Sequence, residues 1–276
     1  MAGTLYVVGT PIGNLGDFSP RAIETLKAVD FIAAEDTRVT QKLLNHFEIK
    51  KPMMSYYQHN LRERGEEIIA RIEAGENCAI VTDAGMPCIS DPGEDLVHLC
   101  AERGVAVAVV PGPVAAMSAL AISGLPTSRF SFEGFLSTNN KNRAEHLRQI
   151  RDDRHTLIFY EAPHKLIYTL EDMLAALGDR RIALCRELTK LHEEVIRTTF
   201  SGALALYKEK SPRGEYVLII EGAPEAEETV LTFEEAVERV KSLREEGLSV
   251  SDAAKQVAKE TGFSKNALYD AAVKDL

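Results

Sequence analysis

Short apolar runs alternate with longer amphipathic stretches over the first 123 residues. The apolar runs predict buried strands, and the amphipathic stretches predict helices that pack on them. Strands are predicted at residues 4–8, 31–34, 52–56, 78–81 and 105–110. One helix is predicted to begin at Ser19-Pro20, and a second to follow residues 35–38 and end near residue 47. Further helices are predicted at residues 61–74, 94–103 and 114–122. Regular alternation of this kind indicates a mainly parallel sheet covered on both faces.

The segment Gly124-Leu-Pro-Thr-Ser128 interrupts this pattern, because glycine and proline favour turns. A second α/β pattern follows it. Strands are predicted at about 131–134, 156–160, 181–185 and 216–221, and helices near 142–151 and 164–177. Residues 193–200 are rich in valine, isoleucine and threonine, which predicts a further edge strand.

A polar stretch at residues 222–228 precedes a purely helical pattern. Helices are predicted at 233–246, 249–260 and 264–274, and the last two are typical of a helix-turn-helix pair. Residues 225–276 hold twelve acidic and seven basic side chains, so a packing or partner-contact module is at least as well supported as a nucleic-acid reader. The predicted domains are therefore 1–123, 124–223 and 224–276.

Composition narrows the class of protein. The chain has 276 residues, is 45% hydrophobic and contains no apolar run long enough to cross a membrane. The first residues lack the charged segment of a secretion signal, so we expect a cytoplasmic protein with no membrane contact. The four cysteines form no C-x-x-C pair and no zinc-ligand spacing, so we expect free thiols and no metal.

The net charge of −10 argues against a strong general affinity for nucleic acid. It leaves room for a local basic face, for which residues 141–154 are a candidate. This stretch contains five basic and three acidic side chains. A solvated helix face is the simpler interpretation, and a phosphate-contacting patch is the functional one.

Three loops rich in glycine and proline follow predicted strands, at residues 9–17, 83–93 and 110–114. Ligands of open α/β sheets bind outside the carboxyl ends of the strands, where these loops would converge. The strand at 78–81 would deliver the carboxylate of Asp83 to that edge. The glycine spacing fits neither a dinucleotide fingerprint nor a phosphate-binding Walker loop. Together the loops predict a pocket for a different, nucleotide-like ligand.

Two charged segments of the second half also begin where a predicted strand ends. They are Phe-Tyr-Glu-Ala-Pro-His-Lys at 159–165 and Cys-Arg-Glu-Leu-Thr-Lys-Leu-His-Glu-Glu at 185–194. Their position indicates a contribution to a site at the sheet edge. Surface charge runs or ion pairs between the two α/β halves are the alternatives.

These segments, with Ala-Glu-Asp-Thr-Arg at 34–38, Asp-Ala-Gly-Met-Pro-Cys-Ile-Ser-Asp-Pro-Gly at 83–93, Pro-Gly-Pro-Val-Ala-Ala at 111–116 and Gly-Glu-Tyr at 214–216, carry a family resemblance. The chain resembles the tetrapyrrole-methylase superfamily, in its branch of bacterial small-subunit ribosomal RNA methyltransferases. The resemblance covers residues 3–222 and the small helical domain. Val114 stands where that branch often has serine, and Lys165 where it often has arginine.

The resemblance implies a two-domain α/β class III methyltransferase fold with a small C-terminal helical domain. It also implies S-adenosylmethionine in the cleft between the domains, and a homodimer. The implied reaction is 2′-O-methylation of a cytidine ribose in the decoding region of small-subunit (16S) rRNA, within an assembled or nearly assembled 30S particle. A methyltransferase of the same fold acting on a tetrapyrrole or another small molecule is the first alternative. A ligand-sensing regulator with a helix-turn-helix tail is the second.

Roles for particular residues follow from the resemblance. The expected cofactor contacts are Pro11, Asp83, Gly85, Met86, Ala115, Ala116, Glu161, Leu188 and Gly214. A base that removes the ribose proton is expected among Glu187, Lys190, His192 and Asp83, with Lys190 and Glu187 ranked first as catalytic residues. The expected substrate-binding cations are Arg38, Arg62, Arg64, Lys141, Arg143 and Arg148.

Overall fold

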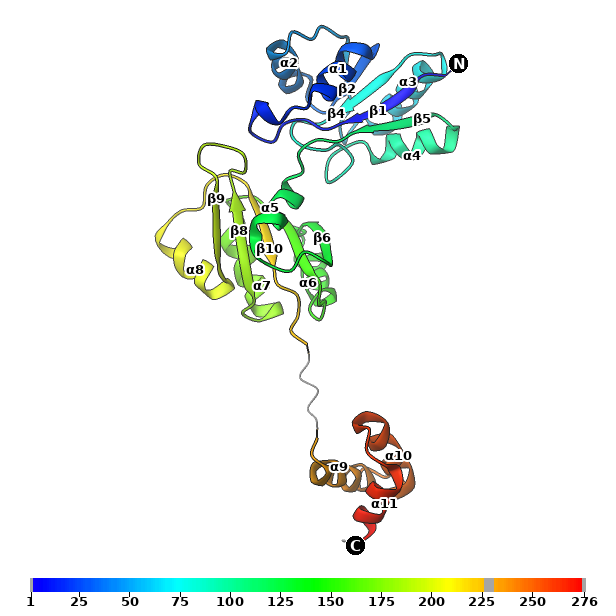
Figure 1. The fold of residues 1–276 in the computed structure, drawn as a ribbon, viewed down its shortest axis with the longest axis vertical. Helices are drawn as coiled ribbons and strands as arrows, with labels where there is room; N and C mark the ends of the chain where they lie inside the picture. Colours follow the sequence, from blue (N-terminus) through cyan, green and yellow to red (C-terminus); the bar gives the residue numbers. More distant parts are fainter. Residues whose placement is uncertain (1, 226–230, 275–276) are drawn as a thin grey trace. The chain divides into compact units, whose positions relative to one another are not determined.

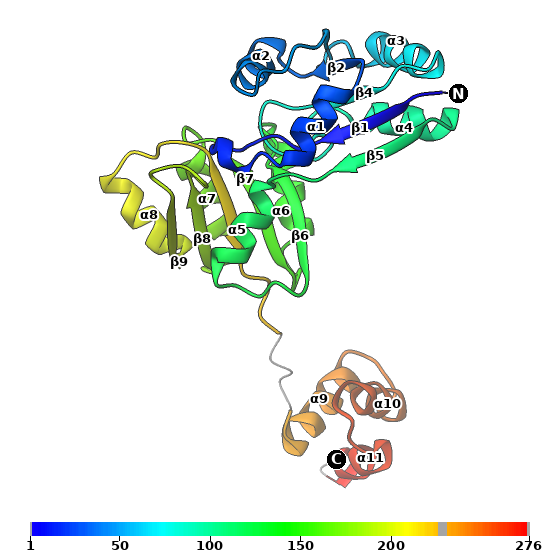
Figure 2. The same cartoon turned by 45° about the horizontal axis from the view of Figure 1, so that its top comes forward.

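The computed structural model describes residues 2–225 and 231–274, and the chain divides after Ala223 into two compact units. Part of the polar stretch predicted at 222–228 lies outside the described residues. The first unit contains two five-stranded sheets. Figures 1 and 2 show these two sheets with their covering helices, and a separate set of three helices in the second unit.

The first sheet is parallel throughout, with strand order β3-β2-β4-β1-β5. Its strands are β1 (Thr4–Val8), β2 (Phe31–Ala34), β3 (Met53–Ser55), β4 (Cys78–Val81) and β5 (Ala106–Val110). These bounds confirm the predicted strands to within two residues at each end. A short 3₁₀ helix, η1 (Leu15–Asp17), lies in the loop after β1.

Helices cover both faces of the first sheet, as the alternating pattern predicts. One face packs on α1 (Pro20–Ala28) and α2 (Thr37–His46), and the other on α3 (Leu61–Glu73) and α4 (Glu94–Arg103). Ser19 caps α1 by accepting a hydrogen bond from the Ala22 N–H, and Pro20 occupies the first turn. The core therefore lies in two layers on either side of the sheet, in which β2 and β4 are buried along their whole length.

The second sheet is mixed, with strand order β6-β7-β10-β8-β9. Its strands are β6 (Phe130–Phe135), β7 (Thr156–Glu161), β8 (Arg181–Arg186), β9 (Glu194–Thr199) and β10 (Tyr216–Ile220). The last strand, β10, is the central one and runs antiparallel to both β7 and β8. The edge strand predicted at 193–200 is confirmed as β9, which pairs antiparallel with β8.

Helices α6 (Asn140–Gln149), α7 (Leu166–Leu177) and α8 (Phe200–Glu209) pack on one face of the second sheet. Helix α5 (Ala115–Ser123) packs on the other face, although it follows the last strand of the first sheet. The sequence pattern did not predict α8. Its apolar face is narrow, but Phe200, Ala203 and Tyr207 are buried against the sheet.

The second unit consists of α9 (Phe233–Glu245), α10 (Val250–Thr261) and α11 (Lys265–Lys274) around their own small core. Thr232 and Glu235 form a reciprocal capping box at the start of α9. Gly262 ends α10 in the left-handed conformation. Within residues 2–225 and 231–274, no helix combines the length and apolar character needed to cross a membrane.

Candidate functional site

The loops after β1, β4 and β5 meet at the carboxyl edge of the first sheet, as predicted. The Thr10 N–H donates to the Gly85 carbonyl at 2.8 Å, and the Gly85 N–H donates back to the Thr10 carbonyl at 3.1 Å. Gly9 and Gly112 touch so closely that a Cβ atom on Gly112 would lie 2.8 Å from the Gly9 Cα. Only glycine permits this approach of two backbones, so the loops after β1 and β5 meet through their main chains.

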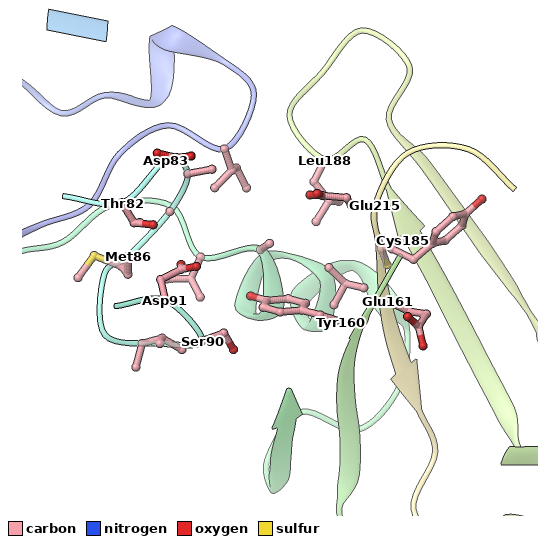
Figure 3. Close-up of a pocket in the computed structure, with 18 of the residues that line it drawn as sticks. Thr82, Asp83, Met86, Ser90, Asp91, Tyr160, Glu161, Cys185, Leu188 and Glu215 are labelled. Carbon is pink, nitrogen blue, oxygen red and sulfur yellow. The ribbon is translucent and has the colours of Figure 1, made fainter. Parts of the chain in front are cut away.

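A cavity of about 340 Å³ lies between the loops of the first sheet and the ends of β7, β8 and β10 (Figure 3). Its volume is within the range of small-molecule sites. The side chains that line it include Ile12, Glu35, Thr82, Asp83, Met86, Ile89, Ser90, Asp91, Phe135, Tyr160, Glu161, Cys185, Arg186, Glu187, Leu188, Lys190 and Glu215.

Part of the wall contributed by the second sheet is apolar. Cys185, Leu188 and Val217 are buried there beside α5. The Tyr160 ring packs on Phe132 and Phe135, with centroids 5.2 Å and 5.5 Å away, and its hydroxyl oxygen accepts a hydrogen bond from the Ala116 N–H. An apolar wall with one fixed polar group suits the flat face of a heterocycle.

The opposite wall is acidic. Burial, together with repulsion from Glu35 and Asp83, raises the pKa of Asp91 from 3.8 to about 6. Burial and the nearby Glu35 also raise the pKa of Asp83. The Thr82 hydroxyl donates to Glu35, and the Asp36 N–H donates to Asp83 Oδ1 at 3.2 Å. Closely spaced carboxylates of this kind favour a ligand that carries positive charge.

A tight turn between β8 and β9 closes the cavity on the side of the second sheet. Glu187 and Thr189 adopt positive φ angles of 52° and 66°, which non-glycine residues rarely do. The Thr189 N–H donates to Glu193 at 2.7 Å, and the Lys190 ammonium donates to Glu187 Oε1 at 3.1 Å. This bonding holds the turn in a strained shape, with Leu191 93% exposed at its tip.

Most of the predicted cofactor residues lie at this cavity. Asp83, Gly85, Met86, Ala115, Glu161 and Leu188 line it. Pro11 follows the Thr10–Gly85 bridge, Ala116 is buried below Tyr160, and Gly214 abuts Glu187. Glu187 and Lys190, the predicted catalytic residues, line the cavity as well. The roles assigned to these residues stay predictions.

The predicted substrate-binding cations lie on three helices, and they differ in solvent exposure and in the ion pairs that they form. Arg38 of α2, Arg62 of α3, and Lys141 and Arg148 of α6 are exposed. Arg64 of α3 is half-buried and pairs with Glu67. Arg38 pairs with Asp36, and Arg148 with Glu145, on the protein surface.

Arg143 does not fit its predicted role. It is 5% exposed, and its guanidinium donates to Asp172 and to the Thr169 hydroxyl. Because α6 is polar on most of its surface, the sequence did not reveal that this side chain faces inward. Arg143 therefore holds α6 against α7 and is not available to a substrate in this conformation.

Sequence reasoning did not select several residues that line the cavity, chiefly Asp91, Tyr160 and Glu215. All three lie within the segments that carry the family resemblance. Those segments pointed to the site, but sequence reasoning assigned no role to these three residues.

Among the described residues, no group of three or more histidine, cysteine, aspartate or glutamate side chains is arranged to hold a metal ion. All four cysteines are free thiols.

Comparison with known proteins places the chain in a family. The family model described as "Tetrapyrrole (Corrin/Porphyrin) Methylases" matches residues 4–204, and "RsmI C-terminal HTH domain" matches residues 232–275. Ribosomal RNA small subunit methyltransferase I of Synechocystis is 48% identical over 97% of this chain and 96% of its own length. The protein of that name from Thermotoga maritima is 47% identical over 220 residues, which are 80% of this chain and 99% of that relative.

Among solved structures, uroporphyrin-III-C-methyltransferase from Thermus thermophilus has the same fold. It superposes with a TM-score of 0.57 at 19% identity, over 79% of this chain and 94% of its own. The share of this chain that superposes is about the size of the first unit, and the family match at residues 232–275 covers the helical unit. The protein is therefore a member of the tetrapyrrole (corrin/porphyrin) methylase family, within its group of ribosomal RNA small subunit methyltransferases I.

Proposed function

We propose that this protein methylates the 2′-oxygen of a cytidine ribose in the decoding region of 16S rRNA. More broadly, it is a small-subunit ribosomal RNA methyltransferase whose methyl donor is S-adenosylmethionine. The observation that carries the proposal is the acidic cavity between the two sheets, in a chain so similar to ribosomal RNA methyltransferases. The choice of cytidine and of the 2′-oxygen comes from the family resemblance.

The cavity fits the donor in three respects. Its volume of about 340 Å³ suits a small ligand, the wall around Tyr160 is apolar, and the carboxylates of Asp83 and Asp91 match a cationic group. We assign the contacts with the donor to Pro11, Asp83, Gly85, Met86, Ala115, Ala116, Glu161, Leu188 and Gly214. The bound donor supplies a methyl group already activated on a sulfonium, so alignment of the acceptor is the main task of the protein.

In the proposed reaction the ribose oxygen forms a bond to the methyl carbon while the carbon–sulfur bond breaks. The sulfur keeps that electron pair and becomes a neutral thioether, and the hydroxyl proton passes to a base. We assign the proton to Glu187 and the stabilisation of the developing alkoxide to Lys190. Lys190 Nζ and Glu187 Oε1 are 3.1 Å apart, both side chains line the cavity, and both are partly exposed to solvent.

For RNA binding we propose the exposed cations Arg38, Arg62, Lys141 and Arg148, without Arg143. Sequence-independent phosphate contacts of this kind fix the position of an RNA that is recognised by its shape. Leu191, exposed at the tip of the turn between β8 and β9, offers an apolar contact for an unstacked base. We further propose that the protein is a cytoplasmic homodimer and that its substrate is an assembled or nearly assembled 30S particle.

The test is methyl transfer from tritiated donor to three acceptors: 30S particles lacking this modification, free 16S rRNA and uroporphyrinogen III. We expect label in the 30S particles, in a cytidine whose 3′ bond resists alkaline cleavage because its 2′-oxygen is blocked. Label in the porphyrinogen alone would overturn the proposal in favour of a small-molecule methyltransferase. Alkali-sensitive label in the 30S particles would keep rRNA as the substrate but refute the 2′-oxygen.

The charge reversal Lys141→Glu tests the proposed RNA surface. We expect a higher KM for 30S particles and an unchanged Kd for the donor. The matched control is Glu171→Gln on α7, an exposed carboxylate outside the cavity lining. An unchanged KM in the Lys141 variant would remove this helix from the substrate surface.

A further inference from the structure

Six carboxylate side chains line the cavity, but only two basic ones do. The carboxylates belong to Glu35, Asp83, Asp91, Glu161, Glu187 and Glu215. The two cations are already paired, Arg186 with Glu194 at 2.5 Å and Lys190 with Glu187 at 3.1 Å. The cavity therefore holds more negative charge than its own cations balance.

Besides Glu187, three of the six carboxylates accept hydrogen bonds from uncharged donors. Glu35 accepts from the Thr82 hydroxyl, and Asp83 accepts from the Asp36 N–H. Glu161 accepts from the Thr169 hydroxyl at 2.5 Å and from the Ala162 N–H at 2.8 Å. Hydrogen bonds of this kind orient the oxygens and satisfy part of their need for a partner.

Asp91 and Glu215 differ from the rest. Within residues 2–225 and 231–274, neither forms an ion pair or accepts a hydrogen bond from the backbone. Asp91 has the Thr82 hydroxyl beside it, but that hydroxyl donates to Glu35. Figure 3 shows Asp91 on the wall of the first sheet and Glu215 across the cavity beside Leu188. A cation between the two walls would meet a carboxylate on either side.

We propose that Asp91, assisted by Glu215, recognises the sulfonium charge of S-adenosylmethionine and discriminates against the neutral thioether S-adenosylhomocysteine. Methyl transfer removes the positive charge from the sulfur, so the attraction that holds the donor vanishes in the product. The same two side chains therefore favour entry of the donor and release of the spent cofactor. This inference rests on donor binding in the cavity and does not require the RNA substrate proposed above.

The groups that face Asp91 come from every neighbouring element of the cavity. They are Glu35 after β2, Thr82, Asp83 and Cys88 after β4, Tyr160 in β7 and Glu215 before β10. No cation is among them. Burial, followed by repulsion from Glu35, Asp83 and Glu215, raises the pKa of Asp91 to about 6, although the Thr82 hydroxyl opposes this shift. Asp91 is then charged at pH 7.5 and largely neutral at pH 5. The preference for S-adenosylmethionine over S-adenosylhomocysteine should therefore be greater at pH 7.5 than at pH 5.

The experiment measures Kd by calorimetry at pH 7.5 for three ligands and the full-length protein. The ligands are S-adenosylmethionine, S-adenosylhomocysteine and sinefungin, an analogue with a protonated amine in the region of the sulfonium. We expect Asp91→Asn to weaken binding of both cationic ligands by about tenfold and that of the thioether by less than about twofold. Glu215→Gln should act in the same direction but by only about two- to threefold, because Glu215 is exposed and better screened.

The wild-type preference for the donor over the thioether should narrow between pH 7.5 and pH 5, and the Asp91→Asn protein should lack this change. Glu171→Gln, with its carboxylate on the exposed side of α7, is the matched control and should leave all three Kd values unaltered. Equal weakening of all three ligands by Asp91→Asn would overturn the proposal, because it would place Asp91 at a part the ligands share. No weakening at all would overturn it too. Failure of the wild-type protein to bind the donor would instead refute the assigned cofactor site.

Discussion

At the scale of single residues, two side chains have environments that their sequence neighbours do not reveal. Asp91 lies in a polar, proline-containing loop, yet it is half-buried among other carboxylates. Arg143 lies in a polar helix, yet it is buried against Asp172 and Thr169. In both cases residues distant in the chain decide whether the charged side chain stabilises or destabilises the folded protein. Substitution of either residue should therefore change the stability measurably.

The raised pKa of Asp91 predicts a pH-dependent cost in stability. The folded protein retains a proton at Asp91 that the unfolded chain loses between pH 4 and pH 6, so stability falls as the pH rises through this window. Asp91→Asn should therefore raise the Tm at pH 8 by about 2–4 °C and change it little at pH 4. Thermal unfolding without ligand measures this. A gain of equal size at both pH values would contradict the electrostatic cause.

Arg143→Ala should destabilise the first unit by about 3 kcal/mol, because it leaves Asp172 without its ion-pair partner and removes the hydrogen bond to the Thr169 hydroxyl. Arg148→Ala, in the same helix, removes a solvent-exposed pair with Glu145 and should leave the stability almost unchanged. Urea unfolding of the two variants gives both values. Similar stabilities would mean that the buried position of Arg143 contributes little.

At the scale of elements, the alternation of apolar runs and amphipathic stretches predicted the strands well, since burial of both sheet faces demands continuous apolar runs. The pattern did not predict α8, because its Ser201-Gly202 opening and narrow apolar face depend on packing for stability. Nor does local pattern fix strand order. The antiparallel insertion of β10 between β7 and β8 follows from pairing across long stretches of chain.

The convergence of the loops was predictable because parallel strands end at one sheet edge, and their contact at Gly9 and Gly112 can be tested. Gly112→Ala would place its Cβ 2.8 Å from the Gly9 backbone, which cannot rotate away as a side chain can. We expect the affinity for S-adenosylmethionine to fall by more than about tenfold, as measured by calorimetry.

Gly104→Ala is the control for this substitution. Gly104 ends α4 with a φ of 66°, and no atom lies within 4 Å of the added Cβ. Its replacement should cost about 1 kcal/mol in stability and leave the affinity unchanged. If Gly112→Ala behaved in the same way, the close approach of the loops would not be essential for the pocket.

At the scale of the whole molecule, the chain combines an enzyme-sized unit with a small helical unit that has its own core. The Thermotoga maritima relative aligns over 220 residues, which is about the length of the first unit, and this alignment covers 99% of that protein. The cavity is lined by residues of the first unit alone. We therefore expect donor binding to be independent of the helical unit.

A protein truncated after Ala223 should fold, unfold in one cooperative transition and bind S-adenosylmethionine with a Kd within about twofold of the full chain. Any loss of methyl transfer to 30S particles would then assign the helical unit to the substrate. Calorimetry of both proteins makes the comparison. A truncated protein that folds but no longer binds the donor would show that residues 224–276 contribute to the cofactor site.

The central position of β10 also constrains how the enzyme is made. Every strand of the first sheet has been synthesised by residue 110, whereas the second sheet lacks its middle strand until residues 216–220 have been added. A growing chain can therefore complete one half early and must wait for the other. Because Glu215 and Tyr216 also line the pocket, a nascent polypeptide cannot assemble a complete binding site before translation has passed that strand.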